Sequence, residues 1–191
     1  MNSHPSQLTS LFQYSQNHDL SFLDINLSID KEDLLSHFNL KNLNSDEFVI
    51  WGELTADNII LSWCKDNIHI DIAPIAIIDS EASPVSVIAD NPIDFIKLLP
   101  LSLRRITSIT NAILRNESDQ DGIIRLRNKY GAEYVLQSYQ NSESEEFKKF
   151  MEWYNENDYS ITDLIPFELV NKAITNYPDF HERMKQVGLP F

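Results

Sequence analysis

The chain has 191 residues, 42% of them hydrophobic and 10% aromatic, so it is long and apolar enough to bury a sizeable core. Its net charge of −14 argues against direct binding to nucleic acid or to an anionic membrane, because both need Lys and Arg to neutralise phosphate. The single cysteine, Cys64, cannot form an intrachain disulfide, and neither a signal peptide nor an apolar run of membrane-spanning length is present, so we expect a cytoplasmic protein.

The first predicted elements are two short helices. Apolar residues recur at helical spacing within residues 5–16, after a proline that suits a first helical turn. Asp30 is a suitable N-cap for a second helix over residues 31–38, which carries an apolar stripe.

The middle of the chain predicts an antiparallel sheet. Runs of β-branched and aromatic residues are separated by turn-forming clusters, of which residues 55–58 close a hairpin. A strictly alternating segment would place three isoleucines on one face of a half-buried strand and His69 with Asp71 on the other. We expect strands at residues 48–51, 59–63, 68–72, 75–78 and 85–89.

The remainder of the chain predicts mainly helices. Asn91 and Pro92 supply an N-cap and a first-turn proline, Pro100 interrupts the helix that follows, and Ser142 with Glu145 resembles a capping box. Two short segments after glycines, residues 123–127 and 134–136, favour strands or irregular edge segments. We expect further helices at residues 101–115, 143–155, 166–175 and 178–187.

These elements predict one α+β domain over residues 1–191, with a central, mostly antiparallel sheet flanked by helices and a helical C-terminal region. Residues 142–191 could instead form a helical extension. No repeat, glycine-rich linker or low-complexity tract marks a domain boundary.

Recognisable catalytic and cofactor-binding motifs are lacking. The four glycines are too widely spaced for a GxGxxG or GxxxxGK[ST] phosphate cradle, so those two modes of nucleotide binding are excluded. Cys64 lies on a predicted strand and the five histidines are scattered, which gives no support for a Cys/His nucleophile pair. We therefore expect no enzyme activity and no cofactor.

Carboxylates and histidine suggest three weaker alternatives. His69 and Asp71 on one strand face could supply two metal ligands, or a base and its orienting carboxylate, for a small metal-dependent hydrolase. Residues 117–128 match a calcium loop at its acidic positions and at Gly122, but Asn128 replaces the bidentate glutamate, so a polar turn is favoured. Paired carboxylates at Asp79, Glu81, Asp90 and Asp94 could serve hydrolysis, although charge near a helix N-terminus explains the last two more simply.

Residues 74–96 resemble a known family. A strand ends in an acidic turn at Asp79, a second strand ends in the small residue Ala89, and a helix begins with Asp94 before Phe-Ile. This order resembles the central segment of SUKH-superfamily proteins, the group of cell-wall-synthesis-regulator-like and immunity proteins. Ala82 stands where glycine would suit the turn, so the resemblance is to a divergent member.

The resemblance implies an α+β fold without catalytic residues. In many bacterial members it also implies neutralisation of a toxin, often a nuclease, by direct binding. The whole match, with the hairpin at residues 48–63 included, covers about 50 of the 191 residues.

Charge and resemblance together predict a protein-binding module whose partner is a basic protein, such as a toxin or a regulated enzyme. We expect the partner-binding residues to be Asp57, Asp66, Asp71, Asp79 and Glu81, with general solubility as the competing explanation for these charges. Residues 97–129 hold seven Lys/Arg and three Asp/Glu, and this basic strip from Arg104 to Lys129 suggests an alternative, a homo-oligomeric adaptor in which the strip meets the acidic remainder of another copy.

Overall fold

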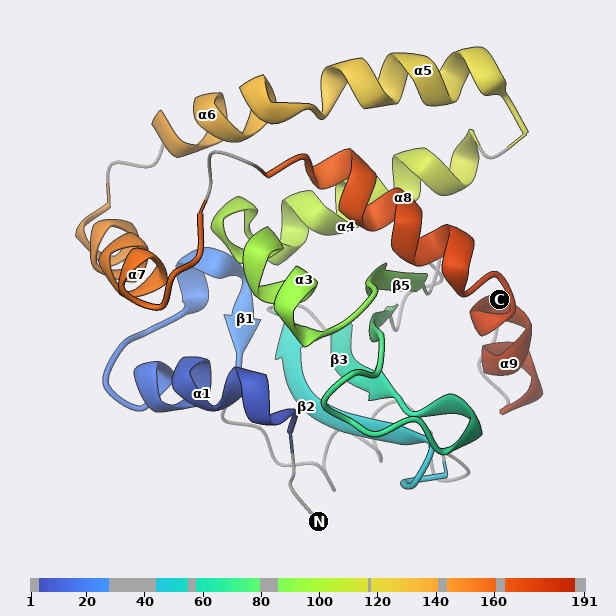
Figure 1. Ribbon diagram of the computed structural model, residues 1–191, viewed down its shortest axis with the longest axis horizontal. Coiled ribbons are helices and arrows are strands. Elements are labelled where there is room, and N and C mark those ends of the chain that lie inside the picture. The colour runs from blue at the N-terminus through green and yellow to red at the C-terminus, as the bar shows by residue number, and fades with distance from the viewer. Residues whose placement is uncertain are drawn as a thin grey trace.

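A computed structural model describes residues 4–27, 44–54, 58–79, 86–116, 118–140, 144–160 and 164–187. Within them the chain forms a five-stranded antiparallel sheet in the order β1-β2-β3-β4-β5, together with many helices, which confirms the α+β prediction (Figure 1). The strands are β1 (Ile25–Asn26), β2 (Phe48–Leu54), β3 (Asn58–Trp63), β4 (Ile75–Asp79) and β5 (Ser86–Ala89).

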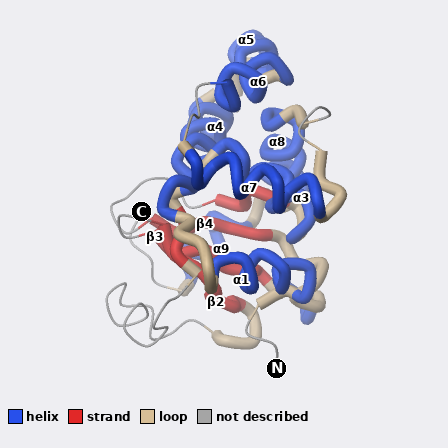
Figure 2. The backbone as a smooth tube through the Cα atoms, turned by 90° about the vertical axis from the view of Figure 1, so that its left-hand side faces the viewer, coloured by secondary structure: helices blue, strands red, loops and turns tan. Residues whose placement is uncertain are grey.

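Helices precede, follow and cover the sheet. The short 3-10 turns are η1 (Ser6–Leu8), η2 (Ser21–Leu23), η3 (Lys65–Asn67) and η4 (Leu99–Leu101). The α-helices are α1 (Thr9–Ser15), α3 (Pro92–Leu98), α4 (Leu103–Arg115), α5 (Gln120–Lys129), α6 (Ala132–Gln140), α7 (Glu145–Glu156), α8 (Pro166–Asn176) and α9 (Phe180–Gln186). In the side view, α5 and α6 form the layer farthest from the sheet (Figure 2).

The predicted hairpin is formed by β2 and β3. The register pairs Phe48 with Trp63 and shifts between Ile50 and Gly52, so Trp51 is the extra residue of a β-bulge. The indole of Trp51 points into the core, where its Nε1 donates a hydrogen bond of 3.1 Å to the hydroxyl of Ser62 on β3. Because both groups are buried, this bond satisfies the indole N–H where water cannot reach it.

The sheet separates two groups of buried apolar residues. The larger core lies on the face of Trp51 and Ile60, and it includes apolar residues of α1, α3, α4, α7 and α8. The smaller core lies on the opposite face around Phe48, Leu61 and Trp63, where Phe180 and Met184 of α9 cover it. Side chains of β3 therefore alternate between the two cores, as the geometry of a strand requires.

The C-terminal helices pack on the same sheet as the preceding elements. α8 lies against β5 and α4, and α9 also contacts β5. The hydroxyl of Tyr154 on α7 donates to the backbone oxygen of Lys97 at the end of α3, at 3.3 Å. These contacts connect residues beyond position 142 directly to the sheet and to the helices that cover it.

The predicted strand at residues 68–72 is wrong. Asp66 and Asn67 take left-handed backbone conformations, with φ of 53° and 62°, which end β3 in the turn η3. The backbone then turns again, with a hydrogen bond of 3.0 Å from the amide of Ile72 to the carbonyl of His69. Ile72 is 64% exposed, so the alternation of isoleucines does not reflect one buried face.

The two segments that were predicted as strands or irregular edge segments are instead helical. Residues 123–127 lie in α5 and residues 134–136 lie in α6. Gly122 does not form a tight turn but lies inside α5, where a Cβ would come within 2.6 Å of the carboxylate of Asp119. The cap of α7 also differs from the prediction, because the hydroxyl of Ser144, two residues after Ser142, accepts the hydrogen bond from Phe147 N.

The helix at Asn91 is confirmed, and the Asn91 side chain accepts a hydrogen bond of 2.9 Å from Asp94 N, as an N-cap does. The predicted helices near residues 5–16, 101–115, 143–155, 166–175 and 178–187 are also present, with small shifts at their ends. The helix predicted at residues 31–38 lies outside the described residues. Among the helices that are described, none combines the length and the apolar character needed to cross a bilayer.

The bond between Trp51 and Ser62 leads to a test of core stability. Replacing Ser62 by Ala leaves the buried indole N–H without an acceptor, which should lower the free energy of unfolding by about 1–3 kcal/mol. Urea unfolding followed by circular dichroism measures this change. Ser86→Ala is the matched control, because among the described residues the hydroxyl of this buried strand serine bonds only to the carbonyl of the adjacent Val87, and its effect should be clearly smaller.

Candidate functional site

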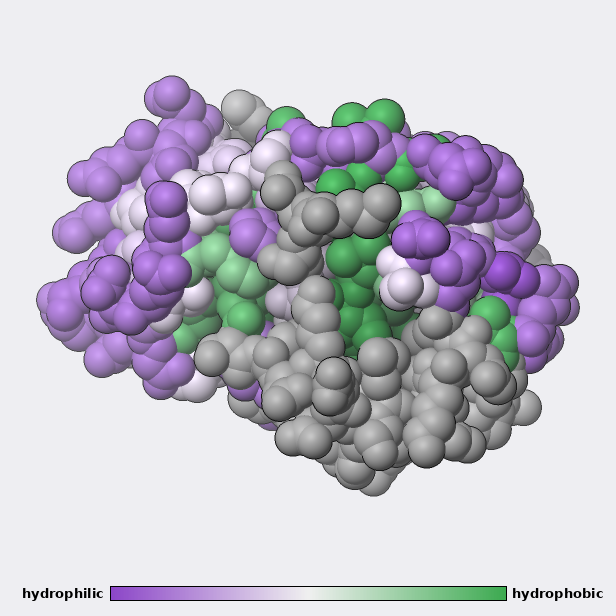
Figure 3. All heavy atoms as spheres, turned by 90° about the horizontal axis from the view of Figure 1, so that it is seen from below, coloured by the Kyte–Doolittle hydropathy of each residue, from purple (hydrophilic) through white to green (hydrophobic). Residues whose placement is uncertain are grey.

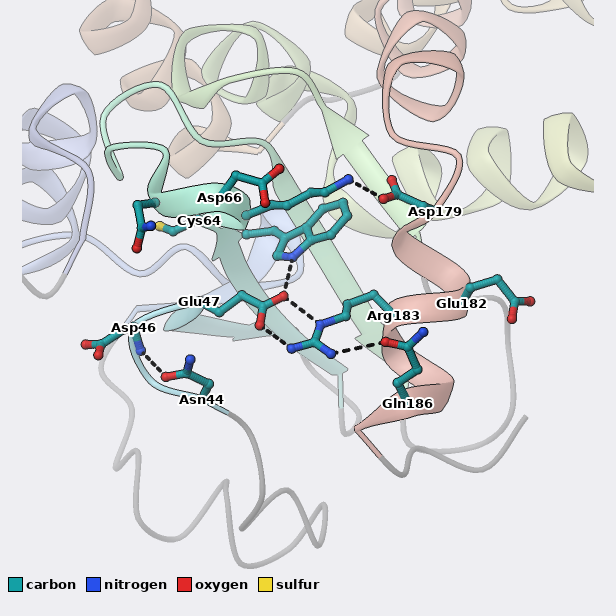
Figure 4. A pocket seen from close by; sticks show the side chains of 12 residues that line it. Asn44, Asp46, Glu47, Cys64, Asp66, Asp179, Glu182, Arg183 and Gln186 are labelled. Carbon is teal, nitrogen blue, oxygen red and sulfur yellow. Dashed lines mark hydrogen bonds and ion pairs between the residues drawn. The ribbon is translucent and has the colours of Figure 1, made fainter.

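A pocket of about 380 Å³ opens between the end of β3, the turn η3 and helix α9 (Figure 4). Five carboxylates and two cationic side chains line it, so the pocket carries an excess of negative charge. We call it the acidic pocket; its lining residues are Asn44, Asp46, Glu47, Trp63, Cys64, Lys65, Asp66, Asn67, Asp179, Glu182, Arg183 and Gln186.

Glu47, Arg183 and Trp63 form the centre of the acidic pocket. Arg183 binds the Glu47 carboxylate through both Nε, at 2.8 Å, and a terminal nitrogen, while Trp63 Nε1 donates to the same carboxylate at 3.1 Å. The hydrogen bonds from Arg183, with smaller help from Trp63, lower the pKa of Glu47 below its ordinary value. Glu47 therefore remains charged and joins α9 to the start of β2 across 136 positions of sequence.

The second cation of the acidic pocket is also neutralised. Lys65 forms an ion pair with Asp179, which raises the pKa of Lys65, and its ammonium group lies 5.4 Å from the centre of the Trp63 ring. Glu182 pairs with Lys185 on the same helix at 2.8 Å. The pocket's own positive charges are thus taken up by its own carboxylates.

Two carboxylates of the pocket remain free. Asp46 and Asp66 are both exposed, and neither forms an ion pair with any residue in the described parts of the chain. Asp46 and Glu182 point away from the central Glu47–Arg183 pair on opposite sides, so negative charge is spread over the rim (Figure 4). This rim is where an incoming cation would meet uncompensated charge.

Cys64 lies in the wall of the acidic pocket but is only 7% exposed. Burial raises the pKa of its thiol, which keeps the thiolate scarce at neutral pH. The side chain therefore acts as apolar lining and not as an activated nucleophile.

Of the five predicted partner-binding residues, those that the structure describes do not lie together at one site. Asp66 lies at the acidic pocket. Asp71 is held by the backbone N–H of Ser6, at 2.6 Å, and this hydrogen bond lowers its pKa. Asp79 ends β4 opposite Asn58, whereas Asp57 and Glu81 lie outside the described residues.

For the alternative of a hydrolase that uses His69 and Asp71, the geometry differs from the one predicted. The two residues lie in a turn and not on a strand, with His69 Nδ1 3.5 Å from the Asp71 carboxylate. The His69 side chain is 73% exposed, and no third ligand is grouped with the pair within the described residues. A two-ligand, solvent-exposed pair is an incomplete metal site.

The predicted calcium loop is not a loop in the structure. From Gln120 onward the residues that would wrap around the ion form α5, so their side chains radiate from a helix. Asp119 is engaged locally, by the backbone of Gly122 above all, which lowers its pKa, and by Arg125 at 3.1 Å.

Asp90 and Asp94 lie near the start of α3 as expected, and both face Lys172 of α8, at 2.6 and 3.8 Å. Asn176 also donates to the Asp90 carboxylate at 3.0 Å. The two carboxylates therefore attach α8 to the end of β5, and their geometry is that of a structural ion-pair cluster.

The basic strip is partly neutralised within the fold. Arg125 pairs with Asp119, and Arg127 pairs with Glu168 of α8 at 2.5 Å. Lys129 lies over the ring of Tyr130, 4.9 Å from its centre. At its beginning, the neighbouring cations Arg104 and Arg105 form no such pair within the part of the chain that the structure describes.

In comparisons with known proteins, the chain matches no family model, no curated protein and no solved structure. The resemblance to the SUKH superfamily therefore stays a hypothesis that rests on the sequence pattern of residues 74–96 and the hairpin at residues 48–63.

Several residues of the acidic pocket carry no local sequence signal. Glu47 directly precedes β2, Asp179 precedes α9 and Arg183 lies in the last turn of α9. The tertiary fold brings them together at the pocket. A long-range contact map would have been needed to identify them.

The Glu47–Arg183 pair predicts a pH-dependent stability. Because the pKa of Glu47 is lowered, its stabilisation is complete above the ordinary value of 4.5 and is lost as the pH falls through the lowered pKa. Glu47→Gln should remove this part of the acid dependence. At neutral pH it should lower the free energy of unfolding by about 1–2 kcal/mol, a modest value because Arg183 is partly exposed to solvent.

Denaturant unfolding between pH 3 and 7 measures both effects. Glu182→Gln is the matched control, since it also removes a helix-α9 ion pair but one that lies in solvent, and it should change stability little. Equal losses in the two variants would contradict a special role for the Glu47–Arg183 pair.

Proposed function

We propose that this protein is a non-enzymatic, cytoplasmic binding module that recognises a basic protein through the acidic pocket. The observation that carries the proposal is the pair of free carboxylates, Asp46 and Asp66, on the rim of a pocket whose own cations are already held by Asp179 and Glu47. A lysine or arginine of the partner would find negative charge there without having to displace an internal cation.

The physical basis is electrostatic. Exposed ion pairs add little affinity each, but an uncompensated patch of one sign attracts the opposite sign over several ångströms and speeds association. In the view from below, hydrophilic side chains gather at both ends of the molecule (Figure 3). The net charge of −14 gives the molecule as a whole a field that attracts a basic partner. The acidic pocket adds a concave, rigid contact within this general field.

An immunity role follows as the specific form of this proposal. It draws on the resemblance to the SUKH superfamily and on the fit between an acidic surface and a basic toxin, often a nuclease in that group. The buried free thiol of Cys64 suits a reducing compartment, where such neutralising proteins would meet their targets.

Charge reversal at the acidic pocket tests the proposal. The tagged protein would be used to capture partners from its native host at low and moderate salt, and a recovered basic protein would then be purified and its association rate measured. Asp46→Lys with Asp66→Lys should slow association at low salt by about tenfold or more, because the steering field is inverted locally.

The control is Glu145→Lys with Glu146→Lys, which makes the same change of charge on exposed positions of α7, away from the acidic pocket. An association rate that falls equally in both variants would reduce the role of the pocket to general net charge. An unchanged rate in the pocket variant would contradict the proposal. Light scattering across a salt series distinguishes the alternative of a charge-driven homo-oligomer, which should dissociate as salt rises.

A further inference from the structure

A second cavity, of about 600 Å³, lies between η2, the start of α4 and the start of α7. Its volume falls within the range of small-molecule sites, and it shares no lining residue with the acidic pocket. We call it the arginine cavity; its lining residues are Phe22, Leu23, Asp24, Pro100, Leu101, Ser102, Arg104, Arg105, Ser108, Ser144 and Phe147.

Arg104 and Arg105 give this cavity its cationic character. Neither guanidinium forms an ion pair or hydrogen bond with another side chain in the described parts of the chain, and the first turn of α4 contains no acidic residue. The three arginines that follow Arg115 in the chain each form an ion pair with a carboxylate, whereas Arg104 and Arg105 form none with the described residues. Two adjacent free guanidinium groups at one concave site indicate a place for an anion.

Hydroxyl groups add neutral donors to the lining of the cavity. The side chain of Ser102 makes no capping hydrogen bond to α4, so its hydroxyl is available. The hydroxyl of Ser144 accepts a hydrogen bond of 3.1 Å from Phe147 N, which leaves its own proton free for donation. The cavity thus offers two cations and two hydroxyl donors.

Part of the lining is apolar. Phe22 is half-buried, and its ring meets that of Phe147 edge to face at 6.1 Å. Leu101 and Pro100 are buried beside them. A ligand that fills this cavity would therefore combine a strongly anionic group with an apolar or aromatic part.

We propose that the arginine cavity binds a small molecule that carries a phosphoryl group on an apolar moiety. A carboxylate is satisfied by one guanidinium, whereas a phosphomonoester is a dianion with three terminal oxygens that two guanidinium groups and hydroxyl donors can share. The apolar moiety lies against Phe22 and Phe147. This site would be independent of the proposed protein-binding function. It would prefer anions, whereas the acidic pocket would prefer cations.

Among the described residues that line the cavity, Asp24 is the one carboxylate, and its removal should affect anion binding in the opposite direction to removal of the arginines. Its backbone takes a left-handed conformation, with φ of 57°, which asparagine adopts readily. Asp24→Asn therefore removes a repulsive charge without straining the backbone, and it should tighten binding of an anion.

The experiment is calorimetric titration of the full chain with phenyl phosphate, benzoate and inorganic phosphate at low salt. Phenyl phosphate should bind most tightly, and Arg104→Gln with Arg105→Gln should weaken it by at least about tenfold, the effect of losing one charge-assisted hydrogen bond or more. Asp24→Asn should strengthen it. Arg115→Gln with Lys149→Gln removes the same charge from exposed positions outside the cavity and should leave binding nearly unchanged.

Circular dichroism of each variant checks that the fold is kept, and all of the substituted side chains reach solvent at least in part. Absence of phenyl phosphate binding to the unmodified protein would overturn the proposal. Equal weakening in the cavity variant and in the control variant would overturn it too, since binding would then follow net charge. Equal affinity for phenyl phosphate and benzoate would overturn the assignment of a phosphoryl group.

Discussion

Burial of β3 on both of its faces is the constraint on which the rest of the fold depends. Ile60 faces the larger core, Leu61 and Trp63 face the smaller one, and Ser62 holds the indole of Trp51. A strand of this kind cannot have a solvated side, so helices must cover both faces of the sheet. The C-terminal α9, which covers the smaller core, brings Arg183 to Glu47 and thereby creates the acidic pocket.

Local patterns were sufficient to predict most of the fold. The hairpin, the strands at β4 and β5, the helix capped by Asn91 and the C-terminal helices each follow from periodicity or capping within a few residues. The errors arose where periodicity is ambiguous: residues 68–72 alternate like a strand but form a turn, and residues 123–127 are too short an apolar run to tell strand from helix. Tertiary contacts decided these cases, such as the hydrogen bond from Ser6 to Asp71.

The candidate site was much less predictable than the fold. Composition drew attention to acidic residues, and of the five that were predicted to bind a partner, Asp66 lines the acidic pocket. The excess charge is nevertheless organised by partners distant in sequence, as in the pairing of Lys172 with Asp90 and of Lys65 with Asp179. Which carboxylates remain free is therefore a property of the tertiary structure. Among the described residues, the same ion pairing neutralises other cations but not Arg104 and Arg105, so the arginine cavity is a cationic site within an acidic protein.

The smaller core has a consequence for the order in which the protein can be completed during synthesis. Its strand residues, from Phe48 to Val87, emerge long before Phe180 and Met184, which lie on α9. Until the ribosome has released that helix, one apolar face of the sheet lacks this part of its cover, and long-range contacts of this kind are slow to close. From the completion of β5 at Ala89 until Phe180 and Met184 have been made, this face of the nascent chain therefore lacks the cover that α9 supplies.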